Sequence, residues 1–590
     1  MPRVAPWDLP SPAERSAGAS LAARLDLPIV AGELLVRRGF ADPDIASAWL
    51  SGSRGSLEDP GSLPDIDIAV ARLNAAIEAG ERIVIHGDYD ADGICGTALL
   101  TRGLRRSGAV VEPFVPDRQR DGYGVAARLV EHAGQREVGV LITVDTGSSA
   151  HEELGRAQAL GIDVIICDHH RFEGRPDGVL AFVNPMRSDS DYPHEDLCGS
   201  GIAYQLLRAL VSARGGDPEH TTADEMALAA IATVGDQMPL RGENRILVRR
   251  GLERLGATKD PGLRALLEIA RLGRRVDVQD VAFQLAPRIN APGRIARART
   301  TLDVLLASDP ATARAGAAQV DALNRERRRI GRECSDDAME QARRALTDGD
   351  PAGLVLSSPA WHRGVVGIAA ARVVNETGRP ALLLAVEGDE AVGSARSVDG
   401  LDLVAALDGC SDLMLRYGGH AAAAGATVAT ERIDDLAARF AASVRAQAEP
   451  STARAPLRID AIATSDTLDT PLAAFLNEMG PFGEGNPVPR LAGHDWSHRR
   501  APRVVGDGHL RLDLDHEGAA RGLIAFGRAE AWLPVAMAES RLDVAFTVRY
   551  RPESKYDVWE MILDDLRPAA RGPAEDESDD ESLDAPGETA

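Results

Sequence analysis

The stretch Ile83-Val-Ile-His-Gly-Asp-Tyr-Asp-Ala-Asp-Gly93 decides the predicted fold, because it is a short apolar strand followed at once by polar side chains. A helix is expected directly after it, over residues 93–106. The same alternation then continues with short apolar strands over 138–144 and 164–167. Short strands that alternate with helices are typical of parallel βαβ units. The sequence therefore predicts an α/β fold with a parallel sheet.

The polar side chains of this stretch have the composition of a cation site. His86, Asp88, Asp90 and Asp92 lie within seven residues at the end of the strand. In parallel sheets, ligands bind beyond the carboxyl ends of the strands, where neighbouring loops diverge. Carboxylate oxygens together with imidazole suit Mn²⁺ or Mg²⁺. The sequence thus predicts a divalent-cation site at this edge of the sheet.

Two simpler interpretations of the stretch are alternatives to the cation site. Asp88 to Gly93 matches the start of an EF-hand loop, but residues 98–100 are apolar where that loop needs its closing acid. An Asp-rich turn that caps the following helix remains an alternative when the stretch is taken alone.

The ends of the next strands carry the same residue types. Asp145 follows the strand 140–144, and Asp168-His169-His170 follows the strand 164–167. Asp236 ends an apolar helix, a position that the helix dipole disfavours for an acid unless a positive charge is near. These groups suffice for two ions about 3.5–4 Å apart, as in phosphoryl-transfer sites. We therefore expect a two-metal phosphoesterase that cleaves a phosphodiester without a covalent intermediate.

The rest of the chain is expected to form further domains. Residues 311–345, rich in Ala, Arg and Glu, predict one long helix, and a second α/β pattern follows it. Beyond residue 456, short alternating segments (509–514, 521–526, 543–549 and 558–563) predict a small β-barrel or sandwich. The predicted units are a helical region 1–56, a catalytic domain 57–310, a connecting helix 311–348, an α/β domain 349–450, a β domain 451–568 and an acidic tail 569–590.

The net charge of −24 does not exclude a nucleic acid as a binding partner, because the charges are unevenly distributed along the chain. The last eighteen residues, 573–590, are acidic and contain no Lys or Arg, so this tail is expected to be a neutral, solvated extension; competition with DNA for a basic groove is the alternative. Arginines cluster elsewhere, over 102–106 and 288–299, and local patches decide contacts with a phosphate backbone. Five scattered cysteines and the absence of a signal peptide or membrane span predict a cytoplasmic protein.

Several motifs in a fixed order extend the pattern over most of the chain. With them the sequence resembles the DHH phosphoesterase superfamily, and within it the RecJ-type exonucleases, which degrade single-stranded DNA 5′→3′. The motifs beyond His86–Gly93 and Asp168-His-His170 are Pro287-Arg-Ile-Asn-Ala-Pro-Gly-Arg294, Trp361-His-Arg-Gly-Val-Val-Gly-Ile368, Gly393-Ser-Ala-Arg-Ser-Val-Asp-Gly400, Gly418-Gly-His-Ala-Ala-Ala-Ala-Gly425 and Pro481-Phe-Gly-Glu-Gly-Asn-Pro487. The resemblance implies a DHH domain, a DHHA1 domain and an OB-fold barrel.

The resemblance also divides the polar residues by role. It implies Asp90, Asp92, Asp145, His169 and Asp236 as ligands of two Mn²⁺ or Mg²⁺ ions, with Asp145 as the bridging carboxylate. His86 and Asp88 match the opening motif, which implies His86 as a further ligand and Asp88 as one of the catalytic groups. Both could instead orient ligands through hydrogen bonds. His170 is expected to contact the scissile phosphate, and Asp168 to orient a ligand.

Substrate handling is likewise implied by the resemblance. The expected DNA-binding residues are Arg118, Arg288, Asn290, Arg294, His362, Arg396, Gly418, Gly419 and His420, with Arg118 assigned to the 5′-phosphate. In the barrel, the most DNA-like residues are Trp496, His498, Arg499, Arg500 and Arg503, although a solvated loop fits them equally well.

The implied activity is release of 5′-mononucleotides in recombination and repair, by a monomer that works with single-strand-binding protein and a helicase. Two alternatives remain open at this point. One is a related phosphodiesterase acting on short oligonucleotides, cyclic dinucleotides or pyrophosphate, and the other is a catalytically inactive DNA-binding scaffold.

Overall fold

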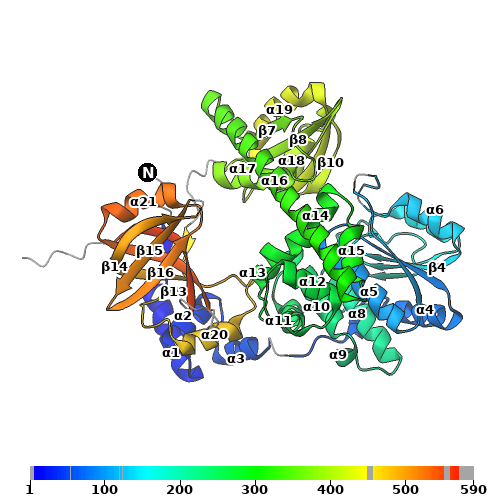
Figure 1. The fold of residues 1–590 in the computed structure, drawn as a ribbon, viewed down its shortest axis with the longest axis horizontal. Helices are drawn as coiled ribbons and strands as arrows, with labels where there is room; N and C mark the ends of the chain where they lie inside the picture. Colours follow the sequence, from blue (N-terminus) through cyan, green and yellow to red (C-terminus); the bar gives the residue numbers. More distant parts are fainter. Residues whose placement is uncertain are drawn as a thin grey trace, which may run out of the picture. The chain divides into compact units, whose positions relative to one another are not determined.

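The computed structural model describes residues 6–52, 55–118, 120–122, 124–447, 456–506, 508–550 and 558–569. The chain forms two compact units, one of residues 52–452 and 480–486, the other of residues 1–51, 453–479 and 487–590 (Figure 1). The predicted acidic tail lies outside the described residues, apart from its first residue, 569. Within the described ranges, no helix has the length and apolarity to cross a membrane.

The first unit begins with the predicted parallel sheet, which is confirmed. Its strand order is β3-β2-β4-β5-β6, and every pair is parallel. The strands are β2 (Arg82–Gly87), β3 (Val110–Phe114), β4 (Val138–Val144), β5 (Asp163–Cys167) and β6 (Ala181–Val183). The next strand after β2 in the sequence, β3, pairs with one edge of β2, and the strand after that, β4, pairs with its opposite edge. Such a reversal opens a crevice at the carboxyl ends of the strands, where doubly wound sheets bind ligands.

Helices cover both faces of this sheet because its strands are apolar on both sides. The helices on one face are α4 (Ile66–Ala79), α5 (Ala91–Arg106) and α8 (Gly199–Ala213), and those on the other are α6 (Ala127–Gln135) and α7 (His151–Ala159). Ile83 and Ile85 share a hydrophobic core with residues of α4, α5 and α8, whereas Val84 packs with residues of α6 and α7. The expected basic patch at 102–106 is not free, since Arg102 pairs with Asp260 at 2.9 Å and Arg106 with Glu225 at 2.6 Å.

A helical layer completes the catalytic domain and leads into the connecting helix. Its members are α9 (Pro218–Thr221), α10 (Ala223–Gly235), α11 (Gly242–Ala257), α12 (Pro261–Ile269), α13 (Val278–Asp280), α14 (Ala286–Ile295) and α15 (Arg299–Leu305), with a π-helical turn, η2 (Val281–Leu285), before α14. The predicted long helix is confirmed as α16 (Pro310–Asp348). Its N-cap is Asp309, whose side chain accepts bonds from the N–H groups of Ala311 and Thr312.

The second α/β domain follows α16 within the same unit. Its sheet has the order β10-β11-β9-β8-β7, parallel only between β7 and β8. The strands are β7 (Leu354–Ser358), β8 (Ala381–Glu387), β9 (Glu390–Arg396), β10 (Met414–His420) and β11 (Ala423–Ala429), and the helices are α17 (Val366–Thr377), α18 (Leu403–Asp408) and α19 (Ile433–Gln447). Because β10 is the edge strand, most of its residues are exposed.

The second unit contains the predicted barrel together with the N-terminal helices. Strands β14 (Arg490–Val505), β15 (His509–His516), β16 (Ala519–Ala525), β18 (Trp559–Pro568) and β17 (Arg541–Tyr550) pair in this order, and a β14–β17 pairing closes the ring. The other elements are α1 (Pro12–Leu25), α2 (Ile29–Arg37), α3 (Pro43–Gly52), β13 (Ala461–Ile462), α20 (Thr470–Met479) and α21 (Ala529–Ala538). The N-terminal segment joins this unit through β1 (Trp7–Asp8), which pairs in parallel with β12 (Leu457–Arg458).

Strand β14 corrects the expectation for the barrel's DNA-like stretch. Trp496 is not an exposed stacking platform, because its side chain is fully buried, with its ring centroid 5.9 Å from that of Phe546. Arg499, Arg500 and Arg503 do remain exposed on this strand. Sequence reasoning missed β14 because its second half is too rich in arginine to show the apolar alternation of a strand.

Candidate two-metal site

The turn after β2 is built by tight backbone packing. A Cβ atom at position 93 would lie 2.2 Å from the backbone nitrogen of Asp88, so only glycine fits there. Asp90 is the N-cap of α5, and its Oδ1 accepts bonds from the N–H groups of Asp92 at 2.9 Å and Gly93 at 3.3 Å. The capping interpretation is therefore correct for Asp90, and it is compatible with a metal site because capping uses only one of the two carboxylate oxygens.

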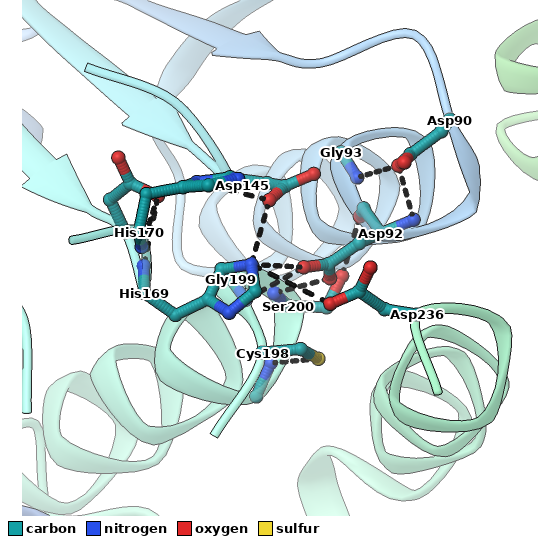
Figure 2. Close-up of polar contacts among 12 residues, drawn as sticks. Asp90, Asp92, Gly93, Asp145, His169, His170, Cys198, Gly199, Ser200 and Asp236 are labelled. Carbon is teal, nitrogen blue, oxygen red and sulfur yellow. Dashed lines mark hydrogen bonds and ion pairs between the residues drawn. The ribbon is translucent and has the colours of Figure 1, made fainter. Parts of the chain in front are cut away.

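Asp92 points the other way, into the start of α8. The N–H groups of Gly199 and Ser200 each donate to one of its carboxylate oxygens at 2.7 Å (Figure 2). The Ser200 hydroxyl donates to the backbone carbonyl of Asp92 at 2.6 Å. Sequence reasoning missed Gly199 and Ser200, although a Gly-Ser-Gly run at a helix start is a signal for anion binding by backbone N–H groups.

Asp145 occupies the position just beyond β4 in a left-handed conformation, with φ of 59°. Its N–H group donates to the carbonyl of Cys167 at 3.0 Å, which ties the turn to β5. Gly199 packs against it so closely that a Cβ there would lie 2.7 Å from the Cα of Asp145. Non-glycine residues in this conformation persist where the surroundings impose it, and they concentrate at functional sites.

Asp168 orients the two histidines that follow it. One of its oxygens accepts the backbone N–H of His169 at 2.8 Å and a hydrogen bond from Nδ1 of His170 at 2.7 Å. Although burial opposes it, this contact raises the pKa of His170 to about 9. Burial likewise opposes ionisation of Asp168, yet the bond from His170 and its charge hold the pKa of that carboxyl well below its usual range. The pair is thus an ionic one at neutral pH.

The carboxylates and imidazoles of adjacent strand ends converge in one cluster. His169 Nε2 lies 3.1 Å from Asp145 Oδ1, 3.6 Å from Asp236 Oδ2 and 3.9 Å from Asp92 Oδ2 (Figure 2). Three overlapping groups have ligand atoms within 4.8 Å of one another. They are Asp145 with His169 and His170, Asp92 with His169 and Asp236, and Asp88 with Asp90 and Asp145. We call these seven residues the metal-ligand cluster.

The electrostatics of the cluster fit a cation. Burial and the neighbouring carboxylates raise the pKa of Asp236 to about 8, and burial with Asp90 does the same for Asp88. The pKa of Asp145 rises well above its usual range for the same two reasons. A buried oxygen of Asp88 has no hydrogen-bond partner in the structure. Buried carboxylates that repel one another, with an orphaned oxygen among them, are the donor set that divalent cations neutralise.

His86 is placed differently from the other residues of its motif. Its ring is fully buried, Nε2 accepts the N–H of Ala126 at 3.1 Å, and burial lowers its pKa to about 4. It belongs to none of the three groups found among the described residues. Its side chain leaves the strand toward the loop before α6 and holds that loop through the N–H of Ala126.

Three of the predicted DNA-binding arginines gather near this cluster. Arg118 lies over the ring of Tyr89, with its guanidinium carbon 5.1 Å from the ring centroid. Burial and the neighbouring Arg118 lower the pKa of both Arg294 and Arg396. Arg294 also interacts with Asp90, and its Nη1 donates to the carbonyl of Gly364 at 3.5 Å. We call Arg118, Arg294 and Arg396 the arginine cluster.

The other predicted DNA-binding residues are not members of the arginine cluster. Arg288 is only 8% exposed and donates to Asp321 at 3.0 Å and Gln284 at 2.8 Å, so its donors serve the packing of α14 on α16. His362 accepts the N–H of Gly364 through Nδ1, and Asn290 keeps a buried, unpartnered Oδ1. Gly418, Gly419 and His420 lie on the exposed edge strand β10.

Comparison with known proteins places each domain. Residues 82–233 match the model of the DHH family, N-terminal domain, residues 350–446 that of the DHHA1 domain, and residues 459–555 that of the RecJ OB domain. The single-stranded-DNA-specific exonuclease RecJ of Dickeya dadantii is 36% identical over 82% of this chain and 87% of its own length. The Bacillus subtilis protein of the same name is 32% identical over 89% of this chain, which spans 66% of that relative.

A solved structure agrees with these relatives. The crystal structure of RecJ from Thermus thermophilus in complex with Mn²⁺ superposes with a TM-score of 0.78 at 30% identity. The match covers 97% of this chain and 81% of that one. A second structure of the same protein, in complex with Mg²⁺, has a TM-score of 0.74 at 29% identity.

Proposed function

This chain belongs to the RecJ family of DHH phosphoesterases, and we propose on that basis that it is a single-stranded-DNA-specific exonuclease working 5′→3′. One observation carries the proposal: a cluster of buried carboxylates and imidazoles lies beside a cluster of arginines that interact with it. The first suits cations, and the second suits the phosphates of a nucleic acid. The products are 5′-mononucleotides, and the enzyme's work is in DNA recombination and repair.

The cofactors are two divalent cations, Mn²⁺ or Mg²⁺. We assign Asp90, Asp92, Asp145, His169 and Asp236 as their ligands, with Asp145 between the two, and Asp88 close enough to join them. When bound, such a pair supplies a hydroxide nucleophile and neutralises the phosphate. His170 holds a proton because of Asp168, so its ring can donate to a non-bridging oxygen of the scissile phosphate.

The arginine cluster provides a place for the 5′ end. Arg118, Arg294 and Arg396 repel one another, which an entering phosphate relieves. An anchored 5′ end beside the metal-ligand cluster sets the first phosphodiester at the reacting position, so hydrolysis releases one nucleotide at a time. Asn290, His362, Gly418, Gly419 and His420 are proposed to contact the DNA backbone near this place. The barrel, with Arg499, Arg500 and Arg503 exposed on β14, is proposed to hold the strand further along.

The cellular setting follows from the substrate. We propose that the enzyme acts in the cytoplasm as a monomer, with a helicase and single-strand-binding protein supplying single strands. All five cysteines are free and buried, which suits a reducing compartment.

An end-labelled assay tests this function. Purified protein with Mn²⁺ is given 5′-labelled and 3′-labelled single strands and a blunt duplex. We expect mononucleotides from the 5′ label at the earliest times, progressive shortening of the 3′-labelled strand, and an intact duplex. Activity confined to dinucleotides would favour a small-substrate phosphodiesterase. Binding without hydrolysis in any divalent metal would favour an inactive scaffold.

A further inference from the structure

The carboxylate of Asp236 is held differently from its neighbours in the metal-ligand cluster. Asp90 and Asp92 both accept hydrogen bonds from backbone N–H groups. Among the residues that the structure describes, no group donates a hydrogen bond to the Asp236 carboxylate, and His169 Nε2 lies 3.6 Å from it (Figure 2). The place of this carboxylate is therefore set by the backbone that carries it.

That backbone turns sharply at the end of helix α10. Asp236 is the C-cap residue of α10, and Gln237 after it has a left-handed conformation, with φ of 57°. The N–H of Met238 donates back to the carbonyl of Thr233 at 3.0 Å. A left-handed conformation is unfavourable for a residue with a side chain, so the surroundings of the turn have to impose it.

Residues 480–486, which belong to the last of the sequence motifs, supply part of those surroundings. The carbonyl of Glu484 accepts the N–H of Leu240 at 2.7 Å. A Cβ atom at position 483 would lie 2.7 Å from a side-chain carbon of Leu240, and one at position 485 would lie 3.0 Å from the Cβ of Pro239. The 480–486 loop is thus packed tightly against the segment that follows the turn.

Buried polar contacts hold the 480–486 loop itself. Asn486 is 4% exposed, and its side-chain amide donates to the carbonyl of Pro481 at 2.8 Å. The backbones of Gly483 and Asn486 exchange hydrogen bonds at 2.9 and 3.2 Å. From helix α11, Arg249 donates to the carbonyl of Gly480 at 2.8 Å. A loop closed and anchored in this way is a firm support for the segment that it contacts.

The place of this loop in the chain indicates which domain it serves. Residues 480–486 belong to the compact unit that contains the catalytic domain, whereas residues 453–479 and 487–590 on either side of them belong to the other unit. The contacts described above are with the segment after α10 and with α11, both in the catalytic domain. The loop therefore supports the catalytic domain, although its neighbours in sequence build the barrel's unit.

We propose that the 480–486 loop is a positioning element for the metal ligand Asp236, and that it acts through the segment from Gln237 to Leu240. This inference rests on the proposed assignment of Asp236 as a ligand. A ligand without hydrogen bonds of its own is oriented by the backbone on either side of it. Changes to residues that orient ligands typically lower metal affinity about ten- to hundredfold.

Calorimetric titration of the full chain with Mn²⁺, without DNA, tests the proposal. Gly485→Ala brings a methyl group against Pro239 from an exposed position of the loop, so the affinity for Mn²⁺ should fall about tenfold. Asn486→Ala removes the bond that closes the loop and should lower the affinity in the same direction. Because residue 485 is exposed, its variant keeps the test open should the substitution of the buried Asn486 prevent folding.

Two controls are matched to these variants. Gly527→Ala imposes the same left-handed strain, with φ of 65° against 69° at Gly485, but nothing lies within 4 Å of the added Cβ. Glu484→Ala removes an exposed side chain and keeps the carbonyl that accepts the N–H of Leu240. Both should bind Mn²⁺ as the wild-type protein does.

A double-mutant cycle separates positioning of Asp236 from a general loss of structure. In an Asp236→Ala background, Gly485→Ala should cause no further loss of Mn²⁺ affinity, because the ligand that it displaces is gone. Three outcomes would overturn the inference: the same loss in both backgrounds, unchanged affinity in Gly485→Ala, and an equal loss in Gly527→Ala. Failure of the ligand assignment would look different, since Asp236→Ala alone would then bind Mn²⁺ as tightly as the wild-type protein.

Discussion

The metal-ligand cluster and the arginine cluster both crowd like charges together, but they are built in opposite ways. Backbone N–H groups hold the carboxylates: Asp90 is fixed by α5 and Asp92 by α8. The arginines have few internal bonds, as the 3.5 Å contact of Arg294 with Gly364 illustrates. The carboxylates are thus held in place by the protein itself, whereas we propose that the arginines use their remaining donors for a substrate.

The clusters also differ in where their residues come from. The carboxylates end neighbouring strands of one sheet, apart from Asp236 at the end of α10. The arginines come from the loop after β3, from α14 and from β9 in the other domain. Under the proposed function, the chemical step would use residues of one domain, and recognition of the strand end would use residues of both. Substitutions should separate these tasks.

The largest effect is expected from the carboxylate shared by two of the three ligand groups. Asp145→Ala should abolish hydrolysis, by about three orders of magnitude or more, because it removes the carboxylate that we propose as the bridging ligand. Binding of single strands, measured by anisotropy, should persist. Asp177→Ala, an exposed acid in the loop after β5, is the control. Persistent turnover in Asp145→Ala would show that another carboxylate lies between the ions.

A smaller effect is expected from the arginine cluster. Arg294→Gln should lower kcat/KM about ten- to hundredfold, mainly through KM, because a charged contact to phosphate is lost while the ligands remain. The dependence of DNA affinity on salt should weaken by about one ion. Arg297→Gln, an exposed neighbour, should change neither quantity. A loss confined to kcat would instead place Arg294 in the chemical step.

A third substitution tests the rigidity of the metal-ligand cluster. Ser200→Ala removes the hydroxyl that holds the backbone of Asp92, so the affinity for Mn²⁺ should fall about tenfold. Calorimetric titration with Mn²⁺ measures this directly. Ser212→Ala, near the exposed end of the same helix, is the matched control. Unchanged affinity would mean that the two N–H groups of α8 suffice.

The smallest effect is expected from the acidic tail. Deleting residues 573–590 should leave kcat and DNA affinity nearly unchanged if the tail is a neutral extension. Gel-shift titrations of the full chain and the truncated chain measure this. A large gain in affinity on deletion would show that the tail competes with DNA for the arginines.

Much of the fold and the metal-ligand cluster could be predicted because the evidence is local. Asp145 and Asp168 each follow an apolar strand directly, so the strand and its candidate ligand can be recognised together within a few residues. The packing around them is not local. That His86 supports the loop before α6, and that Trp496 is buried in the barrel, depends on contacts with segments far along the chain.

The sequence by itself determined which residue types stand at the strand ends, because parallel strands of one sheet bring their carboxyl ends to the same edge. Only the tertiary structure decided how the arginine cluster was assembled. Arg118, Arg294 and Arg396 are each separated by about a hundred residues or more, and many other arginines of similar appearance, such as Arg102 and Arg288, are neutralised by acids. Which guanidinium meets an acid and which is left for a phosphate is decided by the packing of α14, α16 and β9, and no local pattern encodes that packing.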